Sequence, residues 1–189
     1  SDKNRIVFRA ENISYYFKRN NKQGLHQLNI IEDSGKLIGI MGASGSGKST
    51  LLNVLNGNYH PTYGSVTING VNIHTESDKI EGVLGYVAQD DLLIEELSVF
   101  QNLYYNAKLC FSKKSEEEIC ELVNDTLQSI GLFEAKDLVV GSPLEKTISG
   151  GQRKRLNIAL ELIREPSVLF VDEPTSGLSS RDSENIMDL

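Results

Sequence analysis

The first third of the chain has the alternating pattern of hydrophobic and polar residues that is typical of β-strands. Residues 6–10 alternate, Ile13, Tyr15 and Phe17 share one face, and residues 25–31 continue as a strand after a polar turn. The pattern therefore predicts strands that each bury one face.

A strand, a loop and a helix are predicted next. Residues 37–41 are a short apolar run, a Gly/Ser-rich loop follows, and residues 49–55 predict a helix that ends at Gly57. Further on, Asn69-Gly70 between two alternating segments is a strong hairpin signal, and residues 83–88 predict one more short strand.

From residue 97 the hydrophobic period changes from two to 3.6. Three capping-box patterns predict helix starts: Ser98 with Gln101, Ser115 with Glu118, and Ser149 with Gln152. An apolar stripe over 119–130 stops at Gly131, so residues 97–147 are predicted to be mostly helical. The third helix runs to Ile163, and residues 168–171 predict a buried strand. This order indicates an α/β core with a helical insertion.

The loop before the helix over 49–55 matches the phosphate-binding pattern GxxxxGK[ST] in full, as Gly42, Ala43, Ser44, Gly45, Ser46, Gly47, Lys48 and Ser49. Glycines allow successive backbone N–H groups to point inward at the positive end of a helix dipole, which suits an anion. Lys48 can reach the β and γ phosphates, and the Ser49 hydroxyl is the expected Mg²⁺ ligand. The loop therefore predicts a nucleoside triphosphate; the alternative is a glycine-rich turn at the start of a structural helix.

Asp172 and Glu173 come directly after the predicted strand 168–171, at the sheet edge where α/β proteins bind ligands. Asp172 is suited to hold the Mg²⁺ hydration shell, and Glu173 to orient and polarise an attacking water. The alternative is a solvated acidic turn that leads into Pro174.

A second glycine-rich helix start lies at residues 148–152, with the sequence ISGGQ. Such a start can bind an anion, yet the chain has only one lysine-bearing phosphate loop. One chain thus holds two different halves of a site, unless residues 148–152 simply cap a helix without a ligand.

Composition narrows the class of protein. The chain has 189 residues, enough for one domain, and a net charge of −7 that argues against binding nucleic acid. Its apolar runs are far shorter than a membrane span. Cys110 and Cys120 have no zinc-site spacing, so we expect reduced thiols in the cytosol. The chain starts without methionine and ends in an apparent helix, so we expect a fragment of a longer protein.

The order of these motifs resembles the nucleotide-binding domain of ATP-binding cassette (ABC) transporters over essentially the whole chain. The resemblance implies an α/β fold with a P-loop NTPase core, an N-terminal antiparallel β subdomain and a helical insertion, truncated at the C-terminus. Residues 1–189 would form one domain, with its core and β subdomain at about 1–96 and 148–189 and a helical subdomain at about 97–147. It also implies ATP and Mg²⁺ as ligands and a second nucleotide-binding domain as partner.

The resemblance assigns site residues as well. Lys48 and the loop through Thr50 would hold ATP, and Gln89 would meet the metal and the γ-phosphate. In a head-to-tail dimer Ser149, Gly150, Gly151 and Gln152 would close over the partner's phosphate loop. Glu173, Gln89 and Lys48 would be catalytic, with Ser49, Gln89 and Asp172 at the Mg²⁺. Phe17 would stack on adenine, with Tyr16 or Tyr15 as rivals and a core role as the alternative.

The segments Gln152-Arg153-Lys154-Arg155 and Asp172-Glu173-Pro174-Thr175-Ser176-Gly177-Leu178 are most similar to the White, or G-type, half-transporters and their bacterial relatives. This resemblance implies an exporter, with a transmembrane domain on the same parent chain and the ATPase at the cytoplasmic face of the membrane. The three basic residues could instead form a solvated helix face.

Two positions depart from the family pattern. Ser179 stands where the family usually has an aspartate that couples the two sites, and the chain ends before the expected switch histidine. His26, His60 and His74 all lie upstream and cannot take that role. These departures keep open the alternative of a nucleotide-sensing domain that binds without turnover. The family also includes soluble ABC ATPases without transport, which are the second alternative.

Overall fold

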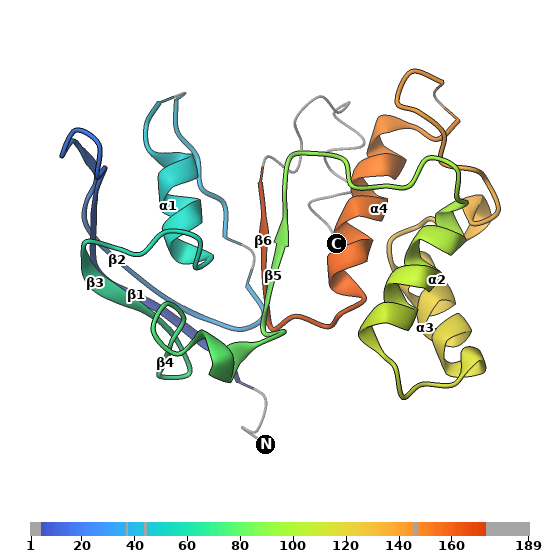
Figure 1. The fold of residues 1–189 in the computed structure, drawn as a ribbon, viewed down its shortest axis with the longest axis horizontal. Helices are drawn as coiled ribbons and strands as arrows, with labels where there is room; N and C mark the ends of the chain where they lie inside the picture. Colours follow the sequence, from blue (N-terminus) through green and yellow to red (C-terminus); the bar gives the residue numbers. More distant parts are fainter. Residues whose placement is uncertain (1–4, 37, 44, 146, 173–189) are drawn as a thin grey trace. The chain divides into compact units, whose positions relative to one another are not determined.

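The computed structural model describes residues 5–36, 38–43, 45–145 and 147–172. It divides into two compact units, Ser1–Leu84 and Gly85–Leu189, each with its own secondary structure. Figure 1 shows the elements of both units along the chain.

The first unit contains a four-stranded antiparallel sheet in the order β2-β1-β3-β4 (Figure 1). Its strands are β1 (Val7–Tyr16), β2 (Gln23–Asp33), β3 (Tyr63–Ile68) and β4 (Val71–Asn72). Ala10, Ile13 and Val66 are fully buried on one side of this sheet. The alternating pattern over residues 6–17 and 25–31 therefore predicted β1 and β2 correctly.

Two backbone features fix the register of this sheet. Asn69 and Gly70 both have positive φ, 48° and 81°, as a two-residue hairpin turn requires, and they join β3 to β4. In β1 the pairing with β3 shifts between Glu11 and Ser14, and Asn12 has φ 53° at this bulge. The predicted hairpin at Asn69-Gly70 is confirmed.

Helix α1 (Lys48–Leu55) follows the Gly/Ser loop, and Val54 and Leu55 are buried. Gly57 (φ 93°) follows its C-terminal end, as predicted. A short 3₁₀ turn, η1 (Ser77–Ile80), completes the described elements of this unit. The strand predicted at 37–41 is wrong for the described part, because residues 38–41 are in no strand and Met41 is 94% exposed. An apolar run becomes a strand only where another strand pairs with it.

Strand β5 (Leu84–Val87), all but its first residue in the second unit, pairs with β6 (Val168–Val171) in a two-stranded sheet. Val87 packs with Ile158 and with the apolar side chains of β6. Both predicted strands are present, although β6 is half-buried along its length rather than fully buried.

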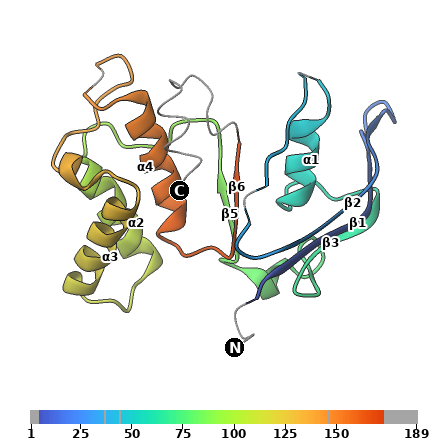
Figure 2. The same cartoon turned by 180° about the vertical axis from the view of Figure 1, so that it is seen from behind.

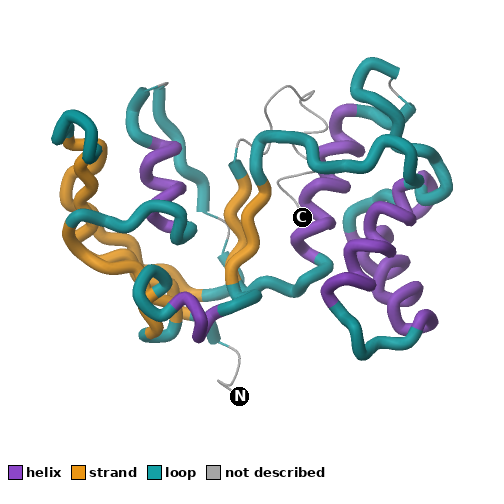
Figure 3. The backbone as a smooth tube through the Cα atoms, in the orientation of Figure 1, coloured by secondary structure: helices purple, strands orange, loops and turns teal. Residues whose placement is uncertain are grey.

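Helices form the rest of the second unit: α2 (Val99–Cys110), α3 (Glu116–Ser129), the 3₁₀ turn η2 (Phe133–Ala135) and α4 (Gly150–Leu162). All three capping boxes predicted from the sequence are present, with hydrogen bonds in both directions. Fully buried residues of α2, α3 and α4, among them Leu103, Leu127 and Leu156, form one core. Figure 2 shows α2 and α3 together on one side of α4, and Figure 3 draws the helices in purple.

Candidate functional site

The phosphate loop in the first unit has the backbone shape that its glycines permit. Gly45 and Gly47 have φ of 79° and 94°, a region that costs a residue with a Cβ about 1–2 kcal/mol. A Cβ added at Gly42 would lie 2.6 Å from Ser46 Oγ. Lys48 Nζ donates a hydrogen bond to the Gly42 carbonyl, so its ammonium is folded back over the loop.

The start of α1 fits an anion. Gly47 precedes the helix in a left-handed conformation, no side chain of the described residues caps it, and its first turn has no acidic residue. The other three α-helices satisfy their first N–H groups with capping boxes. The first amides of α1 are therefore available to a phosphate, at the positive end of the helix dipole. Ser44 lies outside the described residues; Ser49 and Thr50 lie in the first turn of α1.

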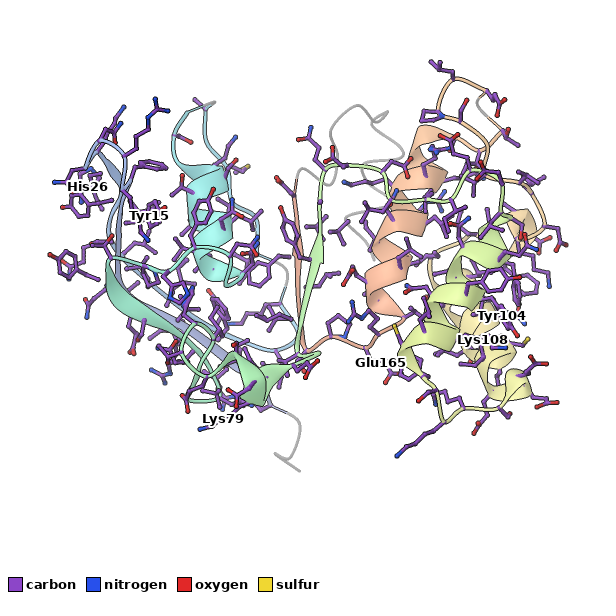
Figure 4. The ribbon with its side chains drawn as sticks, viewed as in Figure 1. Tyr15, His26, Lys79, Tyr104, Lys108 and Glu165 are labelled. Carbon is purple, nitrogen blue, oxygen red and sulfur yellow. The ribbon has the colours of Figure 1, made fainter. Side chains whose placement is uncertain are left out.

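Three aromatic residues at the end of β1 differ in how free their rings are. Phe17 is 36% exposed, and its ring makes a T-shaped contact with that of Tyr15 at 5.3 Å between centroids. Tyr15 is stacked on Tyr59 at 5.5 Å, and Tyr16 packs edge-on to Tyr63 at 6.5 Å. Figure 4 labels Tyr15 on these strands. All three rings therefore have an aromatic partner inside the unit, and Phe17 differs in being exposed where Tyr15 and Tyr16 are half-buried.

The carboxyl end of β6 carries Asp172, at the edge it shares with β5. The Asp172 N–H donates to the Val87 carbonyl at 3.0 Å, and the Tyr86 hydroxyl donates to Asp172 Oδ2 at 3.4 Å. Burial, together with the charge of Asp172, raises the pKa of Tyr86, so the hydroxyl remains a donor at neutral pH. Gln89 is exposed in the bend just after β5. The structure thus brings Asp172 and the strand that leads to Gln89 together; Glu173 lies outside the described residues.

The ISGGQ segment forms the start of α4. Ser149 Oγ accepts the Gln152 N–H at 3.1 Å, and Gln152 Oε1 accepts the Ser149 N–H at 2.8 Å. Ser149 and Gly150 are exposed, whereas Gly151 is buried. The Gln152 side chain is therefore used within its own helix, and the exposed edge of the segment is formed by Ser149 and Gly150.

The three basic residues that follow do not form a solvated face. Arg153 is 8% exposed, and its guanidinium contacts Asp91 at 2.7 Å. Lys154 Nζ donates to the Asp172 carbonyl at 3.4 Å, and Arg155 donates to the Ile130 carbonyl at 3.0 Å. Three successive side chains of α4 therefore contact three different segments of the second unit.

Arg153 forms a polar cluster with Asp91 and Asn157, and the sequence predicted a site role for neither of these two residues. Burial acts to raise the pKa of Asp91, but hydrogen bonds from the Leu93 amide, Arg153 and Asn157 outweigh it, so the pKa lies below its usual value. The sequence has two acidic residues directly after Gln89, Asp90 and Asp91, and nothing local distinguishes the one that binds Arg153, because that partner is distant in the chain.

The histidines all lie in the first unit. His26 is exposed on β2, as Figure 4 shows. His60 and His74 face each other with ring centroids 5.1 Å apart. Burial, and then the neighbouring His60, lower the pKa of His74. Cys110 and Cys120 in the second unit are free.

A phosphate loop at a helix start and a strand that ends in a carboxylate define the class of phosphate-loop nucleotide-binding proteins. Residues 25–176 match the family model described as "ABC transporter". ABC transporter G family member 23 of Arabidopsis thaliana is 36% identical over 192 residues, covering 98% of this chain and 30% of the relative. ABC transporter G family member 13 of the same plant is 41% identical over 162 residues, covering 84% of this chain and 24% of the relative.

A solved structure is similar in fold along almost the whole chain. It is the dimeric structure of a post-hydrolysis state of the ATP-binding cassette MJ0796 bound to ADP and Pi, with a TM-score of 0.74 and 28% identity. The match covers 96% of this chain and 80% of that one. The chain belongs to the ABC transporter family and has the ABC ATPase fold, with G family members among its relatives. It spans less than a third of the length of these curated relatives. None of the helices in the described residues is both long and apolar enough to cross a membrane.

Proposed function

We propose that this chain is the ATP-hydrolysing motor domain of an ABC exporter of the G type. The observation that carries the proposal is the phosphate loop, with Lys48 folded over the glycine cradle in front of the uncapped start of α1. In this proposal residues 1–189 act as one ATP-binding domain, in which about 97–147 form the helical subdomain.

Each site residue has a role that follows from its chemistry. The loop amides and Lys48 bind the phosphates, and Phe17 stacks on adenine. Ser49, Gln89 and Asp172 supply oxygen ligands, the kind that Mg²⁺ prefers. Bound Mg²⁺ neutralises charge on the phosphate oxygens. Glu173 accepts a proton from the attacking water and orients it toward the γ-phosphate.

A second copy of the domain completes each site in the proposal. Ser149 and Gly151 of one copy contact the γ-phosphate held by the phosphate loop of the other; Ser149 is exposed for this contact, whereas Gly151 is buried in the single chain. Support comes from the exposed Ser149 at the positive end of α4 and from the dimeric state named for the solved relative. A related ATP-binding domain on another chain is the alternative partner.

Closure and reopening of this dimer would drive transmembrane helices and export a substrate. Support comes from the relatives, which are named as transporters and are more than three times longer than this chain. In this proposal the domain lies at the cytoplasmic face of the membrane, with its transmembrane domain on the same parent chain.

The test is ATP turnover by the intact protein with Glu173→Gln. We expect the variant to lose turnover and to accumulate as an ATP-bound dimer. Glu134→Gln makes the same chemical change at an exposed position of η2 and should leave turnover unchanged. ATP turnover that survives in Glu173→Gln would refute the catalytic role of Glu173. ATP binding without turnover in the wild type would favour the alternative of a nucleotide-sensing domain.

A further inference from the structure

Side chains of α4 hold the segment that follows Gln89. Arg153 Nε donates to Asp91 Oδ2 at 2.7 Å, and Asn157 Nδ2 donates to Asp91 Oδ1 at 3.3 Å. Asn157 Oδ1 also accepts the Leu92 N–H at 3.0 Å. Two residues one turn apart on α4 thus bind both the side chain and the backbone of this segment.

Asp91, Arg153 and Asn157 form a hydrogen-bonded network in which the α4 residues are buried and the guanidinium is held in one position. The Arg153 side chain is 9% exposed and that of Asp91 31%. Arg153 Nη1 also donates to the Gly141 carbonyl at 2.8 Å and to the Val140 carbonyl at 3.3 Å. A guanidinium held from several sides has few alternative positions, so the ion pair provides orientation more than stability.

Gln89 lies between two anchors. Before it, the Val87 carbonyl accepts the Asp172 N–H at 3.0 Å at the β5–β6 edge. After it, Asp91 is bound to α4. Residues 88–90 connect the two anchors. Val87 also packs against Ile158 of α4, but its backbone is bound to Asp172 after β6, whereas the Asp91 side chain is bound directly to α4. A displacement of α4 relative to the β5–β6 edge therefore moves one end of this short segment and changes the position of Gln89.

We propose that Asp91, Arg153 and Asn157 are positioning residues that couple the placement of Gln89 to the position of α4. This inference rests on the proposed function, in which Gln89 meets the metal and the γ-phosphate. The start of α4 is the segment proposed to contact the partner's nucleotide, so the network connects one site of the dimer to Gln89 of the other.

The test compares steady-state ATP hydrolysis by variants of the intact protein. Asp91→Asn and Arg153→Met should each lower kcat by roughly 10- to 100-fold, the scale of a misplacement by about 1 Å, with KM for ATP nearly unchanged. In a Gln89→Ala background, Asp91→Asn should cause no further loss of kcat. Because the network is proposed to act through Gln89, its loss should not change kcat once the Gln89 side chain is absent.

Arg155→Met is the matched control. It removes another arginine of α4, whose hydrogen bonds go to the Ile130 and Gly131 carbonyls at the end of α3. We expect it to lower the melting temperature while kcat changes little. A loss of kcat equal to that of Arg153→Met would mean that general loosening of α4 explains the effect, and would overturn the inference.

Amide hydrogen exchange measures how firmly the segment after Gln89 is held by α4, and it does not depend on ATP turnover. Asp91→Asn and Arg153→Met should speed exchange over residues 90–95, and Arg155→Met should not. The inference fails if exchange there is unchanged, or if the Asp91→Asn and Gln89→Ala losses in kcat multiply. The proposed function fails separately, if the wild type has no ATPase or Glu173→Gln retains it.

Discussion

Gly64 gives the sharpest prediction about the first unit. It lies in β3 with φ 88°, and a Cβ added there would be 2.3 Å from the Glu11 carbonyl oxygen and 2.4 Å from that of Asn12. Contacts under 3.0 Å to a carbonyl cannot be relieved by turning a side chain. Strain from positive φ costs about 1–2 kcal/mol and the clash adds about 1–3, so Gly64→Ala should lower the free energy of unfolding by about 2–5 kcal/mol.

Gly70→Ala separates the two contributions. Gly70 has a similar φ of 81°, but no described atom lies within 4 Å of its added Cβ, so only the strain of about 1–2 kcal/mol should remain. The assay is urea unfolding followed by tyrosine circular dichroism, with hydrogen exchange of the β1–β3 ladder to report on the first unit alone. If Gly64→Ala were no more destabilising than Gly70→Ala, the packing of β3 over the β1 bulge would be wrong.

Three further predictions concern caps, pH and adenine. Ser115→Ala and Ser149→Ala each remove a capping box, so each should lower the free energy of unfolding by about 0.5–2 kcal/mol. Only Ser149→Ala should also abolish ATP turnover. Equal turnover in both variants would contradict the proposed role of Ser149 at the partner's nucleotide. The pKa of His74 is lowered from 6.5 in the folded state, so the unfolded state binds its proton more readily and the free energy of unfolding should fall as pH drops below about 6.5. His74→Gln should flatten this dependence in urea titrations at several pH values, and an unchanged slope would refute it. Phe17→Ala should raise KM for ATP whereas Tyr63→Ala, at a 67% exposed position of the same sheet, should not; equal effects on KM would refute stacking by Phe17.

Local signals in the sequence predicted most elements of the fold. Capping boxes, the Asn69-Gly70 hairpin and the apolar stripe of α3 act within a few residues, so their physics is contained in short stretches of sequence. The prediction of a strand at 37–41 was wrong because a strand needs a neighbouring strand to pair with, and the local sequence does not specify that neighbour. The shape of the loop before α1 could be predicted because the glycines that permit its backbone conformation and the lysine that folds over it are neighbours in the sequence.

The surroundings of α4 could not be predicted for the same reason. Arg153 looked equally compatible with a solvated face, since its partner Asp91 is 62 residues away in the chain. Burial of a charge depends on such distant pairing. Sequence motifs therefore indicated the groups proposed to contact nucleotide, whereas the residues proposed to position Gln89 could be found only from the structure.

A mixing experiment on composite sites tests the proposed head-to-tail dimer most directly. Lys48→Ala disables the phosphate loop, and Ser149→Ala disables the segment proposed to act on the partner. Each variant of the intact protein should be inactive alone. An equal mixture that exchanges subunits should recover up to about a quarter of wild-type ATP turnover, because half the dimers then contain one intact site of two. A mixture as inactive as its components, with mixed dimers shown to form, would contradict the head-to-tail arrangement.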